Sequence, residues 1–301
     1  MARLLKYFLL TTHMFLGHCL MISTALKAEW QPVPSAKIIH PRRSGHTAFS
    51  SSSSDPTYVF GGYIEKEPQK ECEPFFREVR NDLWKWENKI QSWEETIASG
   101  DIPRPRLVTA SATLNGKAYI FGGWDPETMG TGGSILDSVH SLDLTSSSLV
   151  WKELTPLPDG PASRHVALSL PNQNRILIHT HRCVDHVWIF DPESGEYTKQ
   201  MTTGVSPGSV GLHAASMLDD ETLLVFGGAV KDGTMTNRSY VLDTKTWKWK
   251  QVDLRDGDKA CPSPRAGACL VTHKTKTGKS NSAILFGGAE SSESGLKPRG
   301  D

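Results

Sequence analysis

The segment Ala118-Tyr-Ile-Phe-Gly-Gly123 decides the fold, because the chain repeats it. The same pattern, an apolar β-prone run closed by two glycines, occurs three more times, at Thr57–Gly62, Leu223–Gly228 and Ala283–Gly288. A degenerate copy, Arg175–Thr180, keeps the apolar run, and we align His179 and Thr180 with the two glycines. Recurrence at intervals of about 50 to 60 residues indicates a repeat architecture with variable loops.

A second marker is an aromatic residue that follows the next apolar strand at a fixed distance. The pairs are Trp86 and Trp93, Phe190 and Tyr197, Leu242 and Trp249, and, with two residues inserted, Leu142 and Trp151. The residues between the members of a pair include Asp, Pro, Ser and Gly, which are typical of tight turns. Each pair therefore predicts two strands joined by a turn.

A third marker is an arginine ahead of each copy. Arg43, Arg106, Arg164 and Arg265 stand there, and the fourth copy has Val210 instead. Each repeat thus contains four expected strands: strand a after the arginine, strand b with the diglycine, strand c, and strand d with the aromatic. Short strands between Gly, Pro, Ser and Asp clusters predict an all-β protein, and repeated four-stranded sheets are typical of a propeller.

These markers resemble those of the kelch-type β-propeller family over residues 42–288. The resemblance implies that the repeated glycines and aromatics are scaffold residues, since paired glycines allow close approach of neighbouring backbone. The scaffold set is Gly61, Gly62, Gly122, Gly123, Gly227, Gly228, Gly287, Gly288, Trp93, Trp151, Tyr197 and Trp249.

We count about five recognisable blades, the last of which is composite or truncated. After the last diglycine the sequence shows no clear strand c. Trp30-Gln-Pro-Val-Pro34 resembles a strand d with its linker, so we expect it beside the C-terminal strands, in a blade that takes strands a and b from the end of the chain. The alternative is that the chain is a truncated product of a longer protein.

The expected organisation is a signal peptide or signal anchor at 1–28, the propeller at 29–288 and a disordered tail at 289–301. Arg3 and Lys6 precede an apolar run and then small residues, which is the order of a secretory signal. This predicts a secreted protein or one of the endomembrane lumen, with a cytoplasmic location as the alternative and no other membrane span. In an exported chain Asn237 would be a possible N-glycosylation site.

Four cysteines lie outside the apolar leader: Cys72, Cys183, Cys261 and Cys269. They allow three disulfide pairings, of which we expect Cys72 or Cys183 with Cys261. The alternative is that they are buried free thiols.

Charge argues against two classes of partner. The chain has 33 Lys plus Arg and 33 Asp plus Glu, so its formal net charge is zero. Nucleic-acid-binding domains carry a basic face, and anionic membranes attract basic segments. We therefore expect no nucleic-acid partner and no membrane-surface partner.

The sequence contains no convincing catalytic constellation, and we expect neither an enzyme nor a cofactor. Gly204-Val-Ser-Pro-Gly208 matches a nucleophile-elbow pattern, but Pro207 has no N–H to offer an oxyanion. Imidazole and thiolate bind zinc and copper, which makes His179, His181, Cys183 and His186 weak metal candidates. Their alternative interpretation is a decayed repeat.

We expect a protein-interaction module that binds a protein or peptide. The b–c and d–a connections of a propeller emerge on one face, and the b–c connections 63–82 and 124–137 are long. The expected partner-binding residues are Arg43, Arg106, Arg164, Arg265, Phe75, Phe76 and Trp124. Two alternatives stay open: arginines that brace the blades by bonding to carbonyls, and a secreted sugar-modifying kelch enzyme, sialic-acid-mutarotase-like or galactose-oxidase-like.

Overall fold

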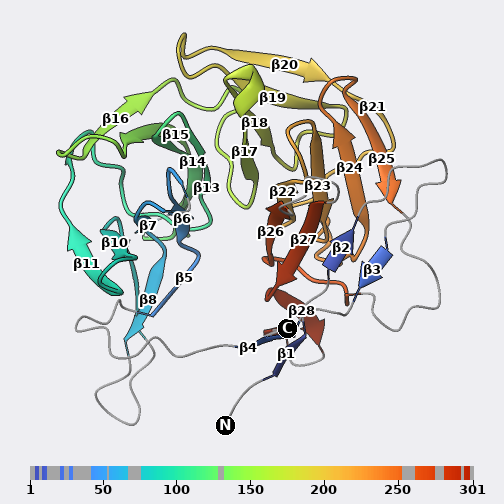
Figure 1. Cartoon of the computed structure of the whole chain (residues 1–301), viewed down its shortest axis with the longest axis horizontal. Helices are drawn as coiled ribbons and strands as arrows, with labels where there is room; N and C mark the ends of the chain where they lie inside the picture. Colours follow the sequence, from blue (N-terminus) through green and yellow to red (C-terminus); the bar gives the residue numbers. More distant parts are fainter. Residues whose placement is uncertain are drawn as a thin grey trace. The chain divides into compact units, whose positions relative to one another are not determined.

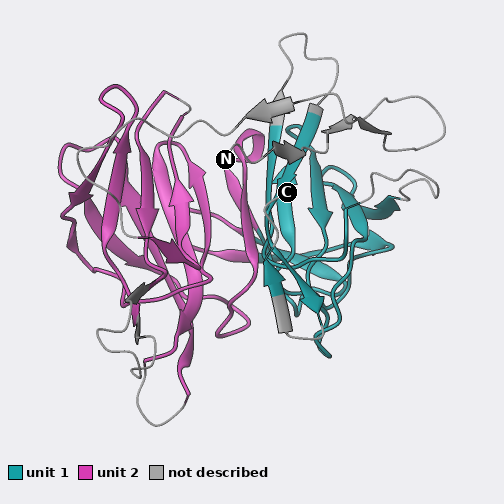
Figure 2. Cartoon of the chain, turned by 90° about the horizontal axis from the view of Figure 1, so that it is seen from below, with its two compact units in different colours: residues 1–32, 178–189, 198–301 teal, residues 33–177, 190–197 magenta. Residues whose placement is uncertain are grey.

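The computed structural model describes most of the chain after residue 41 and four short N-terminal strands. The described residues are 4–6, 9–11, 21–23, 27–29, 42–52, 54–66, 76–127, 132–252, 262–274, 281–292 and 295–298. The chain divides into two compact units (Figure 2): unit 1 contains Met1–Pro32, Ile178–Ile189 and Thr198–Asp301, and unit 2 contains Val33–Leu177 and Phe190–Tyr197.

The all-β class predicted from the sequence is confirmed. Within the described ranges the only helix is the short 3-10 turn η1 (Pro171–Gln173), and none has the length and apolar character to cross a membrane.

Unit 2 contains two antiparallel sheets that follow the expected a-b-c-d order (Figure 1). The first has the order β11-β10-β7-β6, with β6 (Thr47–Phe49), β7 (Thr57–Phe60), β10 (Leu83–Glu87) and β11 (Ser92–Thr96). The second contains β13 (Ala110–Leu114), β14 (Lys117–Asp125), β15 (Ser134–Asp143) and β16 (Val150–Leu154). A fifth strand, β12 (Ser99–Gly100), pairs in parallel with β16 and links the two repeats.

Unit 1 repeats this pattern. One sheet has the order β21-β25-β24-β23-β22, with β21 (Thr203–Gly204), β22 (Ala214–Met217), β23 (Thr222–Phe226), β24 (Ser239–Asp243) and β25 (Lys248–Val252). In it β21 pairs in parallel with β25, as β12 does with β16. The repeated sequence therefore produces repeated hydrogen bonding down to the linker strands.

The last sheet joins the two ends of the chain. β26 (Cys269–Lys274) pairs with β27 (Asn281–Phe286), and β27 pairs with β2 (Leu9–Thr11), which pairs with β3 (Met21–Ser23). A composite last sheet is as expected, but a strand stands in the position of strand c, which we expected to be missing. β3 holds the strand d position that we predicted for Trp30–Pro34, and Trp30–Pro34 itself lies outside the described residues.

The N-terminal segment expected as a signal sequence contributes to two sheets. Besides β2 and β3, β1 (Leu4–Lys6) pairs with β4 (Lys27–Glu29). A short apolar run can serve either as the core of a signal or as a buried strand, and its periodicity does not separate the two. Export and cleavage stay predictions.

Two segments expected as loop or tail are hairpins. In the first repeat β8 (Tyr63–Lys66) pairs with β9 (Phe76–Val79), and β5 (Arg43–Ser44) pairs with β8. After the last diglycine, β28 (Ala289–Ser292) pairs with β29 (Gly295–Pro298). Residues 289–292 and 295–298, which we expected in a disordered tail, are therefore strands, and β28 follows its diglycine as β8 follows Gly62.

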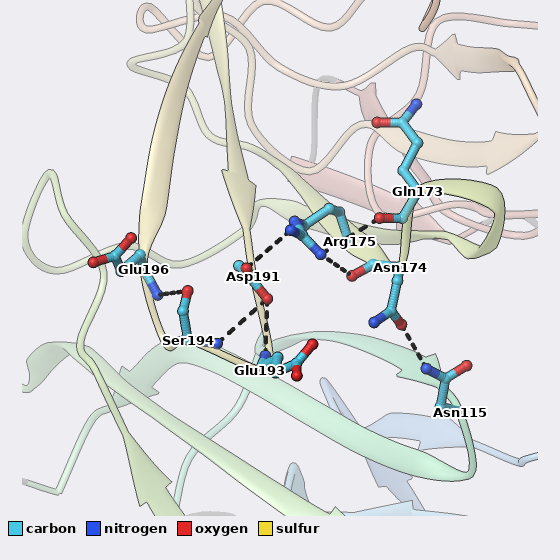
Figure 3. A network of polar contacts seen from close by, with 8 residues as sticks. All are labelled: Asn115, Gln173, Asn174, Arg175, Asp191, Glu193, Ser194 and Glu196. Carbon is cyan, nitrogen blue, oxygen red and sulfur yellow. Dashed lines mark hydrogen bonds and ion pairs between the residues drawn. The ribbon is translucent and has the colours of Figure 1, made fainter.

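The degenerate repeat contains β17 (Val166–Leu170), β18 (Arg175–His179), β19 (His186–Phe190) and β20 (Tyr197–Met201), and the boundary between the units falls within it. Polar contacts hold its turns (Figure 3). The Arg175 guanidinium pairs with Asp191 at 2.9 Å, and Asp191 accepts the backbone N–H of Glu193 at 2.9 Å. These bonds fix the c–d turn in a repeat that has lost its glycines.

The diglycines and aromatics take the scaffold positions that their repetition indicates. Gly122 and Gly123 have φ values of 54° and 114°, in the region that favours glycine. Trp151 stands opposite Leu142 across β15 and β16, and its ring lies 5.1 Å from that of Phe60 in the preceding repeat. Burying tryptophan against phenylalanine contributes both area and aromatic contact to the core.

Candidate binding face

The repeated arginines form bonds inside the fold. Arg43, Arg106 and Arg265 each donate an N–H to the carbonyl of the first glycine in their own repeat, at 2.9, 3.0 and 3.1 Å. Arg106 and Arg265 are only 1% and 2% exposed. A buried guanidinium that satisfies a buried carbonyl is a structural bond. For these three residues the geometry supports the bracing alternative over an exposed arginine ring.

Arg164 does not occupy the same repeat position as the other three. Two residues after Arg106 the chain has a positive φ at Val108, and the same conformation occurs at Arg164 itself, with φ of 60°. The second glycine of the preceding repeat donates to the carbonyl of Arg106 in one case and of Ala162 in the next. Ala162 is therefore the structural equivalent of Arg106. The sequence alignment was wrong by two residues here, because the length of the linker before strand a varies.

A surface pocket of about 290 Å³ lies in unit 1, on the face that the sequence predicts to bind. It is formed by the d–a connection between β21 and β22 and by the b–c connection between β23 and β24. Its walls include Pro207, Val210, Gly227, Met235, Arg238 and Tyr240. The mixture of apolar walls and a few polar groups is typical of a recognition site. Arg238 is exposed, and within the described part of the chain its guanidinium has no ion-pair partner.

The expected aromatic anchors are placed unevenly. Trp124 is half-buried, exchanges two backbone hydrogen bonds with Leu107 at 2.8 and 2.9 Å, and has its indole against Gly133. The side chains of Phe75 and Phe76 lie outside the described part of the structure. Sequence reasoning missed Arg238, although its signal was available: it stands directly before strand c, where the first repeat has Asp82.

The weak metal candidates are scattered. His179 is buried and its Nδ1 lies 3.1 Å from Nε2 of His213, while His181 is exposed. Cys183 is buried and its Sγ accepts the Thr180 backbone N–H at 3.4 Å, while Cys72 and Cys261, named in the expected disulfide pairings, lie outside the described residues. His186 pairs with Asp185 at 2.8 Å. In the described ranges no three His, Cys, Asp or Glu side chains are grouped as metal ligands.

The structure also corrects the alignment of the degenerate repeat. β18 ends at His179 as β7 ends at Phe60 and β23 at Phe226. The His179 ring lies 5.7 Å from Trp249, much as Phe60 lies 5.1 Å from Trp151. His179 therefore stands in the phenylalanine position, and the glycine positions fall on Thr180 and His181. An imidazole used as a core aromatic explains its burial without a ligand.

The remaining sequence candidates have structural partners. Ser206, the serine of the nucleophile-elbow pattern, lies on the linker between β21 and β22 and donates to the Val184 carbonyl at 2.8 Å. Asn237, in the possible glycosylation site, donates its side-chain amide to the Pro262 carbonyl at 3.2 Å. Asn81 forms the same bond to Pro103 in the first repeat, at 3.0 Å. In both repeats the asparagine side chain therefore holds the following d–a linker by a hydrogen bond to its backbone.

Buried histidines make folding stability sensitive to acid. Burial, with Arg106 nearby, lowers the pKa of His140 to about 4, and burial beside His213 holds the pKa of His179 well below 6.5. The unfolded chain binds these protons at higher pH than the folded chain, so stability is complete above about pH 6.5 and is lost as pH falls. We expect denaturant unfolding to show a loss of about 1 kcal/mol or more between pH 7.5 and pH 5.

A variant separates this cause from general acid denaturation. His140→Gln should reduce the pH dependence between pH 7 and pH 5 more than His181→Gln does, because His181 is an exposed ring whose pKa is lowered only by partial burial and by Arg182 nearby. Equal slopes for all three proteins would contradict the assignment.

The four-stranded sheets, paired glycines and buried arginine braces define a kelch-repeat β-propeller, and comparison with known proteins agrees. The chain belongs to the family described as the KLHDC2/KLHL20/DRC7 kelch-repeats domain, whose model matches residues 18–222 and 179–297.

Three known proteins illustrate what this chain is similar to. Kelch domain-containing protein 2 of Bos taurus is 24% identical over 273 residues, covering 82% of this chain and 63% of that protein. Host cell factor of Drosophila melanogaster is 27% identical over 241 residues, covering 71% and 16%. Acyl-CoA-binding domain-containing protein 4 of Arabidopsis thaliana is 26% identical over 211 residues, covering 65% and 29%. The chain therefore spans less than two thirds of each relative.

Proposed function

We propose that this chain is a non-catalytic interaction module that binds a protein partner through the face carrying its b–c and d–a connections. The observation that carries the proposal is the pocket in unit 1, whose walls come only from these two connections and the strand ends beside them. Interaction surfaces are recognised by a concave, partly apolar centre with polar groups at its rim. Val230, at the pocket, is 38% exposed and adds apolar surface there.

Capture of partners by the purified chain, quantified by mass spectrometry, tests the face. Val230→Glu places a charge on the b–c connection, and we expect it to reduce capture of the specific partner at least about tenfold, the effect of losing about 1.4 kcal/mol. Val271→Glu is the matched control, because Val271 is similarly exposed in the same unit but lies within β26.

The result depends on the difference between the two variants. Loss of capture in Val230→Glu alone, with unchanged thermal unfolding, supports binding at this face. Equal capture by both variants, or equal loss in both, would contradict it. Partners that bind wild type and both variants alike are background.

A further inference from the structure

The pocket lies where one repeat departs from the internal ion pair of another. In the first repeat Arg43 donates to the Gly61 carbonyl at 2.9 Å and forms a bidentate pair with Asp82, with N–O distances of 2.6 and 2.9 Å. The Arg43 side chain is 1% exposed. This guanidinium fills the space between the first glycine and the start of strand c.

Backbone hydrogen bonds identify the equivalent residues in the pocket repeat. The Gly61 N–H donates to the carbonyl of Asp82, and the Gly227 N–H donates to the carbonyl of Arg238. Arg238 is therefore equivalent to Asp82. Arg43 and Val210 each stand two residues before a positive-φ residue, Gly45 and Leu212 respectively, so Val210 is equivalent to Arg43.

Both members of the ion pair have changed, and the charge has reversed. Val210 is too short to reach the place of the guanidinium, and the pocket lies there, beside Gly227. Arg238 supplies a cation where the first repeat has an anion. Among the residues that the structure describes, no acidic side chain pairs with it.

We propose that this pocket receives an acidic side chain of the protein partner, which pairs with Arg238; the inference rests on the proposed function. A carboxylate there would restore an ion pair in which the partner provides the anion. Arginine is suited to this role because its planar fork binds a carboxylate through two parallel hydrogen bonds. Val210 and Met235 offer apolar contact to the methylene groups of a glutamate. A cationic side chain is disfavoured, because Arg238 would repel it.

Capped peptides test the assignment on the full chain. The probes are acetyl-Ala-Glu-Ala-amide, its Gln counterpart and acetyl-Ala-Ala-Ala with a free carboxylate. Binding is measured by NMR, from the chemical shifts of the backbone amides of Gly227, Met235 and Arg238. We expect concentration-dependent shifts with the Glu peptide and at least tenfold weaker binding of the Gln peptide. Absence of Glu-dependent shifts, or shifts with the free-carboxylate peptide alone, would overturn the proposal.

Two variants locate the charge. Arg238→Gln keeps a polar side chain but removes the positive charge, and it should weaken binding of the Glu peptide at least tenfold. The double variant Val210→Arg with Arg238→Asp rebuilds the ion pair of the first repeat, so it should unfold at the wild-type temperature or above it and bind no Glu peptide. Wild-type affinity in either folded variant would overturn the proposal.

Comparing Val230→Glu with Arg238→Gln in the partner-capture experiment keeps this inference distinct from the proposed function. If partner capture is lost in Val230→Glu but unchanged in Arg238→Gln, the binding face stands and the acidic-side-chain assignment is wrong. If neither variant affects capture, the binding face itself is wrong.

Discussion

Replacing Gly122 by alanine is expected to destabilise the protein by about 3–5 kcal/mol, enough to prevent folding of a marginally stable domain. Gly122 is buried and has a φ of 54°. An added Cβ would collide with the carbonyl oxygen of Ala162 and lie 2.8 Å from that of Leu136. Both are backbone atoms, Leu136 in β15 and Ala162 in the linker before β17, so relief requires moving the main chain. The measurement is the free energy of unfolding in denaturant, or the soluble yield where the variant does not fold.

Gly160→Ala is the matched control for backbone conformation. Gly160 has a φ of 74°, and a Cβ there would meet nothing within 4 Å. It should therefore show only the conformational penalty of a left-handed alanine, about 1 kcal/mol. The difference between the two variants measures the collision. Equal losses would mean that the diglycine is required only for its dihedral angles.

The strand pattern could be predicted from the sequence because each marker reports a local constraint. Glycine at positive φ and a cross-strand aromatic are short-range requirements, so they recur at readable spacings. Trp86 opposite Trp93 and Leu242 opposite Trp249 are paired in the structure as their spacing indicates. The degenerate repeat was harder, because His179 is an imidazole in a phenylalanine position and no longer resembles its equivalents.

The candidate site depends on hydrogen bonds between residues far apart in the sequence, which the spacing of the motifs does not reveal. The equivalence of Asp82 and Arg238 follows from backbone bonds to Gly61 and Gly227, across b–c connections of unequal length. The equivalence of Ala162 and Arg106 likewise requires the hydrogen bonds of the second glycines. Variable linkers allow the sequence register to slip while the backbone register is fixed by hydrogen bonding. An arginine near the expected place, Arg164, was therefore assigned to the wrong position.

The second large expected effect is a loss of folding stability when a buried arginine brace is removed. Arg106→Met retains the apolar length of the side chain but removes its donors to the carbonyls of Gly122 and Arg104, at 3.0 and 3.1 Å. Hydrogen bonds made by a charged group contribute about 1.5–3 kcal/mol each, and Thr109 still donates its hydroxyl to the Gly122 carbonyl at 3.3 Å, so we expect a loss of about 2–3 kcal/mol. In a domain of this size, that lowers the unfolding temperature by several degrees.

Two further substitutions distinguish a brace from a binding residue. Arg104→Met removes an exposed side chain paired with Asp125 at 3.5 Å, and should cost less than about 0.5 kcal/mol. Arg164→Gly places glycine at a φ of 60°, as Gly45 and Gly267 stand at the equivalent positions, and should leave stability unchanged or raise it. If Arg106→Met were as stable as wild type and partner capture fell instead, the buried bonds to the glycine carbonyls would not be structural, and the arginine would belong to the binding face after all.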